Sequence, residues 1–180
     1  NAEILTLTYG SIVRQLISDY EDVDEVNKQL EKMGYNIGQR LIDEYLARSK
    51  TTSCSDFKEV AERIAHVGFR MFLNTSARVA AWAPDGRSCS LILEDNPLTD
   101  FVELPEQLRG LSYSNILCGV IRGALEMVRV GLTMYRGQAQ VNIDAECSFV
   151  RDSLRGDDAT ELRLTFVAAA PEAYPYKDDD

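Results

Sequence analysis

Four cysteines and a single histidine are the side chains of this chain best suited to nucleophilic or metal chemistry. Cys54 is the most notable of them because it directly precedes a helix signal. Ser55 or Asp56 can cap a helix that begins at Phe57, and Glu59 is placed to bond back to the cap. Because the start of a helix lowers the pKa of a thiol, we expect Cys54 to be the most reactive cysteine.

The helix after Cys54 has a face of small side chains. At 100° per residue, Ala61, Ala65, Gly68 and Phe72 fall within about 60° of one another. Such a face is either covered by a neighbouring helix or left open as a groove for a thin apolar ligand. An acyl chain attached to Cys54 and lying along this groove is one such ligand. Spacing alone leaves both interpretations open.

The sequence does not assemble a catalytic site. His66 lies 12 residues beyond Cys54, or about 18 Å along a helix, so it cannot serve as the base for that thiol. No CxxC pair or other metal-ligand spacing occurs, and Gly119-x-x-x-Gly123 does not follow a strand as a dinucleotide-binding turn would. We therefore expect a protein without a catalytic site and without a bound metal.

Length and charge narrow the function classes further. The 180 residues carry a net charge of −10, with no basic stripe, which disfavours nucleic-acid binding and unaided adhesion to anionic lipid. The most apolar window, residues 116–132, contains Arg122, Glu126 and Arg129, and this excludes a membrane span. Cysteines without paired spacing fit a reduced cytosolic compartment. We expect a soluble protein.

The chain length fits one α+β domain over residues 1–170. An acidic tail over residues 171–180 follows, either flexible or derived from a tag, and because the chain opens on Asn1 rather than Met we expect further residues upstream.

Periodicity predicts the elements of this domain. Apolar residues three and four apart predict helices, and the second contains Gly34 and Gly38, which we interpret as a bend near Gly34 rather than as a close helix crossing. Alternating residues predict strands, which form a largely antiparallel sheet with helices stacked on one face. The predicted helices are 5–20, 26–46, 57–73 and 111–130, and the predicted strands are 78–82, 89–93, 139–149 and a closing strand whose inward side chains are Leu162, Leu164 and Phe166.

Several stretches resemble one family closely. They occur in the family's order along nearly the whole chain, and they are Leu7–Gly10, Met33–Gly38, Arg40–Ile42, Tyr45–Ser49, Ser90–Glu94, Asn96–Leu98, Asp100–Pro105, Tyr113–Val120 and Gly123–Val128. These residues resemble the Bet-three family, which is subunit three of the TRAPP (trafficking protein particle) complex.

The resemblance implies a function and a site. It implies a non-catalytic core subunit of a vesicle-tethering complex in transport from endoplasmic reticulum to Golgi, located in the cytoplasm and peripherally at both membranes. The family's acylated cysteine corresponds to Cys54, which implies a palmitoyl or similar acyl group, and the small residue of the family's acyl tunnel corresponds to Gly68. The tunnel lining implied for this chain is Phe57, Ala61, Ile64, Ala65, Gly68 and Phe72.

The resemblance also implies partners. They are an identical subunit or a related TRAPP subunit, and a Rab-family GTPase that meets the assembled complex as its nucleotide exchange factor. The alternative hypothesis is a soluble pocket domain that binds or senses a free apolar ligand.

Overall fold

The computed structural model describes residues 2–49, 56–136 and 143–168. The tail predicted over residues 171–180 and the segment that holds Cys54 lie outside the described residues. The elements follow one another as α1 (Ala2–Asp19), α2 (Val23–Ser49), α3 (Phe57–Arg63), a π-helical turn η1 (Ile64–Gly68), α4 (Phe69–Leu73), β1 (Arg78–Ala80), β2 (Ser88–Leu93), the 3₁₀ turn η2 (Glu106–Leu108), α5 (Ile116–Arg136), β3 (Ile143–Arg151), the 3₁₀ turn η3 (Ser153–Arg155) and β4 (Thr160–Ala168).

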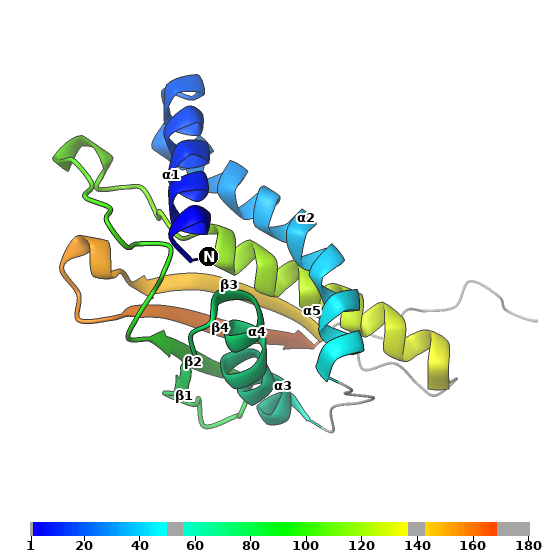
Figure 1. The fold of residues 1–180 in the computed structure, drawn as a ribbon. Helices are drawn as coiled ribbons and strands as arrows, with labels where there is room; N and C mark the ends of the chain where they lie inside the picture. Colours follow the sequence, from blue (N-terminus) through cyan, green and yellow to red (C-terminus); the bar gives the residue numbers. More distant parts are fainter. Residues whose placement is uncertain (1, 50–55, 137–142, 169–180) are drawn as a thin grey trace, which may run out of the picture.

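The strands form one antiparallel sheet in the order β1-β2-β4-β3. The β1-β2 hairpin turns at Pro84-Asp85-Gly86, where Gly86 adopts a φ of 68°, a left-handed conformation that glycine tolerates. The predicted strand at 139–149 is observed from Ile143 onward, and its residues 139–142 lie outside the described part of the chain. These outcomes confirm the α+β class, with helices on one face of the sheet (Figure 1).

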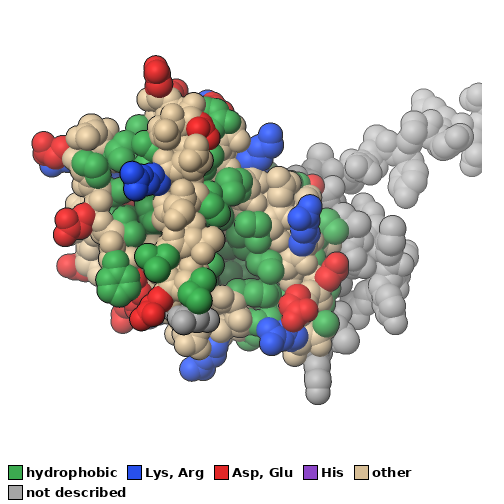
Figure 2. Space-filling view, turned by 45° about the horizontal axis from the view of Figure 1, so that its top comes forward, with side chains coloured by type: hydrophobic (Ala, Val, Ile, Leu, Met, Phe, Trp, Pro, Cys, Tyr) green, Lys and Arg blue, Asp and Glu red, His purple; other side chains and the backbone are tan. Residues whose placement is uncertain are grey.

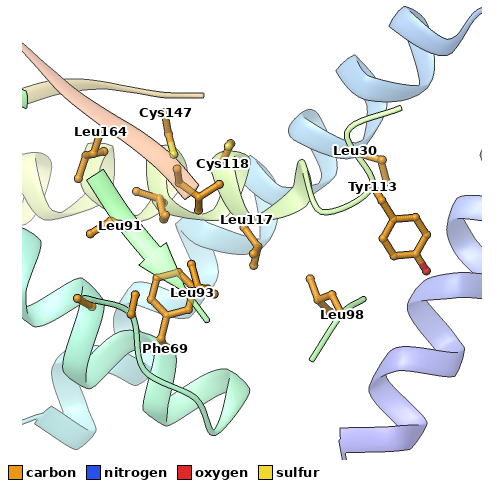
Figure 3. Packing of buried hydrophobic residues seen from close by; sticks show 14 of the residues in the cluster. Leu30, Phe69, Leu91, Leu93, Leu98, Tyr113, Leu117, Cys118, Cys147 and Leu164 are labelled. Atoms are coloured by element: carbon orange, nitrogen blue, oxygen red, sulfur yellow. The ribbon is translucent and has the colours of Figure 1, made fainter. Parts of the chain in front are cut away.

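The core lies between the sheet and the helices. Side chains that alternate along β2 and β4, such as Leu91 and Leu164, are fully buried. On the helical face of the sheet they pack with Leu117 and Cys118 of α5 and with Phe69 of α4 (Figure 3). Replacing one of the buried leucines by Ala would cost about 2 to 5 kcal/mol.

Helices α2 and α5 pack directly against each other, and α1 projects beyond the rest of the domain (Figure 1). α2 is one continuous helix from Val23 to Ser49. Gly34 and Gly38 of α2 meet Gly119 and Gly123 of α5 at a close crossing, which is the alternative to the bend that the sequence pattern predicted. A Cβ atom on Gly34 would lie 2.1 Å from the carbonyl oxygen of Ile116, so nothing larger than glycine fits there.

Candidate functional site

An apolar cavity of about 360 Å³ lies between the helices. Hydrophobic side chains from α1, α2, α3, η1, α4 and α5 form its walls, together with Leu98 from the loop before α5. Figure 2 shows a recess on this face whose walls are hydrophobic side chains. A cavity of this lining suits an aliphatic ligand, since it offers almost no hydrogen-bonding groups to a polar one.

The glycine crossing shapes two walls of this cavity. Ile37, Leu41 and Tyr45 recur every fourth residue along α2 and line one wall. Val120 and Ala124 of α5, which packs directly against α2, also line the cavity. Because the glycines hold the two helix backbones in contact, the larger side chains that flank the crossing are held at fixed positions around the cavity.

The third wall comes from α3, η1 and α4. A π turn has more residues per turn than an α-helix, so it rotates every later side chain relative to the α-helical pattern. Val60, Ile64, Gly68 and Phe72, spaced four apart, all line the cavity. At Gly68, the nearest atom to a built Cβ would be the carbonyl oxygen of Arg63 at 3.9 Å, so Gly68 faces open space.

Of the six residues predicted to line the acyl tunnel, three line the cavity and three do not. Ile64, Gly68 and Phe72 line the cavity. Ala61 and Ala65 are fully buried in the core and do not line it. Phe57 does not line it either: its ring packs edge-on against Trp82, with ring centroids 5.4 Å apart, and against Phe166 of β4. The predicted single row of small residues is therefore split by the π turn into a core face and a cavity face.

The segment that holds Cys54 lies outside the described residues, but the helix start that follows it is described. Asp56 caps α3, and its carboxylate accepts a hydrogen bond of 2.9 Å from the backbone N–H of Glu59. This is one of the two caps that the sequence predicted. The chain two residues after Cys54 thus enters a helix whose next turn carries Val60, a cavity residue.

Few polar groups border the cavity. Arg63 lines it and forms a 2.7 Å ion pair with Glu59, one turn earlier on the helix. Tyr9 also lines it, but its hydroxyl donates to the backbone oxygen of Tyr113, and burial raises the pKa of Tyr9 so that it stays neutral. The polar atoms of both residues are therefore already engaged within the protein.

Sequence reasoning missed much of the lining. Leu5 and Tyr9 of α1, Ile37 and Leu41 of α2, and Leu98 were assigned no role in the site. The four-residue spacing of Ile37, Leu41 and Tyr45 was visible, but a cavity wall has the same spacing as a core face. Only the three-dimensional arrangement shows which of these side chains face an open space.

The potential nucleophiles that the structure describes are poorly placed for catalysis. Cys89, Cys118 and Cys147 are buried free thiols, and burial raises the pKa of Cys89 to about 11. His66 lies on the surface, 3.2 Å from Glu62 on the same helix. Within residues 2–49, 56–136 and 143–168, no group of three or more His, Cys, Asp or Glu side chains is arranged to hold a metal ion. Nor does any helix in these ranges have the length and apolar character needed to cross a membrane.

The fold and cavity define an α+β domain whose helical layer borders an apolar recess. The family model described as "Transport protein particle (TRAPP) component" matches residues 5–165. The chain belongs to this family, and the resemblance seen in the sequence motifs is confirmed.

Two individual relatives are similar to this chain over nearly its whole length. The trafficking protein particle complex subunit 3 of Dictyostelium discoideum is 49% identical over 176 residues, which cover 97% of this chain and 88% of the relative. The corresponding subunit of Saccharomyces cerevisiae, BET3, is 42% identical over 99% of this chain and 87% of its own length.

A solved structure is also similar. It is the crystal structure of trafficking protein particle complex subunit 3 from Naegleria fowleri, covalently bound to palmitic acid. It matches with a TM-score of 0.83 and 47% sequence identity, over 93% of this chain and 95% of that one.

Proposed function

We propose that this protein is a non-catalytic core subunit of a vesicle-tethering complex in transport from endoplasmic reticulum to Golgi. It acts in the cytoplasm and peripherally at both membranes, carries an acyl group on Cys54, and holds the acyl chain in the apolar cavity. The observation that carries the proposal is this cavity, together with a 47% identical relative that is covalently bound to palmitic acid.

The cavity is positioned to receive a chain that starts near the beginning of α3. Val60, Ile64 and Gly68 line it in successive turns, and Gly68 lies 12 residues beyond Asp56, or roughly 18 Å along the helix at about 1.5 Å per residue. Acylation joins the sulfur of Cys54 to the carbonyl carbon of a thioester donor, whose own thiol leaves with the cysteine proton. The aliphatic chain can then lie along the cavity residues of this helix.

Burial of the chain is energetically favourable. At about 0.8 kcal/mol per methylene, ten buried methylenes correspond to roughly 8 kcal/mol of transfer free energy. A single acyl chain anchors a protein to a membrane only weakly, and the net charge of −10 provides no attraction to anionic lipid. The acyl chain therefore serves the stability of the domain before it serves as an anchor.

The assembly role follows from the family. TRAPP components act as subunits, and we propose that this chain pairs with an identical or related subunit through α1 and α2. Ile4 and Leu7 of α1 are 63% and 66% exposed, which leaves apolar surface for such a partner. The assembled complex would act on a Rab-family GTPase as its nucleotide exchange factor.

Denaturing intact-mass spectrometry tests the acylation. Protein purified from its own cells should carry an added acyl mass that survives unfolding, and Cys54→Ser should lack it. Cys89→Ser is the matched control, because it removes a buried thiol and should keep the acyl mass. An apolar ligand that is lost on denaturation would instead support the alternative, a pocket domain for a free ligand.

A further inference from the structure

Phe101 is the most exposed of the large hydrophobic residues that the structure describes. It is 85% exposed, although it belongs to an ordered loop between β2 and α5. Its backbone has a φ of +62°, in the left-handed region that bulky residues rarely adopt. Exposure and conformation thus both carry an energetic cost.

The loop around Phe101 is held rigidly from beneath. Asn96 is buried, accepts a hydrogen bond from the backbone N–H of Leu98 at 3.2 Å, and donates to Ser114 at 3.0 Å. Its backbone oxygen accepts from the N–H of Thr99 at 2.9 Å, and the N–H of Val102 in turn donates to the oxygen of Thr99 at 3.2 Å. The turn that contains Phe101 is therefore fixed by the buried residues below it.

Helix α1 adds a further tie to this loop. The hydroxyl of Thr6, itself buried, donates a 2.6 Å hydrogen bond to the backbone oxygen of Pro97. Leu98 is buried and lines the cavity, so the loop is also fastened by an apolar contact. Strain that the surroundings impose on an exposed residue is typical of functional positions. A rigid loop also presents its aromatic ring without an entropy cost on binding.

The loop that contains Phe101 is acidic. Glu94, Asp95, Asp100 and Glu103 are all exposed, and residues 94–105 contain no Lys or Arg. Two copies that met through this loop would bring these carboxylates together, which disfavours self-association here. The same charges oppose insertion of Phe101 into an anionic membrane.

We propose that Phe101 is the anchor of a docking surface for a different protein subunit of the same complex. The partner surface that fits is an apolar pocket bordered by Lys or Arg side chains. An exposed aromatic ring seated in such a pocket is a usual binding hot spot, and opposite charges around it speed association. This inference rests on the proposed role as an assembly subunit and assigns a specific surface to it.

The test uses the full chain and the other subunits of its complex, each purified singly, in pairwise binding measurements by biolayer interferometry. Phe101→Asn removes the ring but keeps a residue that tolerates a left-handed φ. Val167→Asn on β4 is the matched control, because Val167 is also exposed, at 43%, and lies seven residues along the strand from Thr160, the β4 residue that contacts Asn96 of this loop. Phe101→Tyr keeps an aromatic ring.

We expect Phe101→Asn to weaken binding to one subunit at least tenfold, while Val167→Asn and Phe101→Tyr stay within threefold of the wild type. The melting temperature of Phe101→Asn should be equal to or above that of the wild type, because strain is relieved. The affinity of the wild type for its partner should decrease as the salt concentration rises, because salt screens the attraction between opposite charges.

The outcomes distinguish a failure of the proposed assembly role from a failure of the proposed docking surface. If the wild type binds none of the subunits, the proposed assembly role itself is wrong. If a subunit binds the wild type and Phe101→Asn equally, only the docking surface is wrong. Self-association that depends on Phe101, or binding to vesicles with anionic lipid that depends on it, would also overturn the proposal in favour of a second copy or a membrane.

Discussion

The close crossing of α2 and α5 makes a sharp prediction for Gly119→Ala. A Cβ atom built on Gly119 lies 2.0 Å from the carbonyl oxygen of Glu31 and 2.7 Å from the backbone nitrogen of Tyr35. Real Cβ contacts are essentially never shorter than 3.0 Å, so the two helices would have to separate by about 1 Å. Both obstructing atoms belong to the backbone of a helix, and neither can turn aside as a side chain could.

The free-energy change follows from two opposing effects. Overpacking in a rigid contact costs about 3 kcal/mol, at the upper end of the usual range. Alanine in place of a helical glycine recovers about 1 kcal/mol of helix propensity. We therefore expect the free energy of unfolding to fall by about 2 kcal/mol, which corresponds to a melting temperature lower by roughly 4 to 8 °C in a domain of this size.

Gly68→Ala is the matched control. It is the same substitution in a helical segment, but the nearest atom to its Cβ would lie 3.9 Å away. It should leave the unfolding free energy unchanged or raise it by up to about 1 kcal/mol. Urea unfolding followed by circular dichroism measures both variants. A Gly119→Ala protein as stable as Gly68→Ala would refute the close crossing.

Three further predictions concern the cavity and a buried carboxyl. Gly68→Leu should fill the cavity and abolish acylation of Cys54, which an undiminished acyl mass in denaturing mass spectrometry would contradict. Cys54→Ser should lower the melting temperature, while the assembled complex should still be found with membranes in a fractionation assay. An unchanged melting temperature together with loss of membrane binding would show instead that the acyl chain is a membrane anchor. Burial raises the pKa of Asp152 above its usual value near 3.8, so the unfolded state ionises first as pH rises. The unfolding free energy should therefore decrease as pH rises from about 4 through the folded-state pKa, and Asp152→Asn should flatten this dependence in urea titrations at several pH values.

Much of the fold could be predicted because local patterns determined it. The alternation of Cys147 and Phe149 against Glu146 and Ser148 placed the correct face of β3 on the core. The cap at Asp56 and the hairpin turn at Gly86 are short-range signals that depend on few neighbours. In each case the residues that decide the structure lie within a few positions of one another.

The π turn and the helix crossing could not be predicted in this way. A π turn shifts the helical phase, which a fixed 100° period cannot represent, so Ala65 and Gly68 were assigned to one face although they lie on two. Gly34 and Gly38 are equally compatible with a bend and with a close contact, because both remove a side chain. Only the matching glycines on α5, 85 residues away from Gly34 in the case of Gly119, decide between them.

The cavity and its proposed ligand can be compared on one energy scale. The recess opens onto the surface of the domain (Figure 2), so water can enter it and the cost of a closed, empty cavity does not apply to its full 360 Å³. Burying ten methylenes of a ligand there corresponds to roughly 8 kcal/mol of transfer free energy. That figure is comparable to the whole stability of a typical domain, about 5 to 15 kcal/mol. If the proposed acyl chain occupies the recess beside the glycine crossing and the π turn, its loss should weaken the domain as a whole rather than one surface of it.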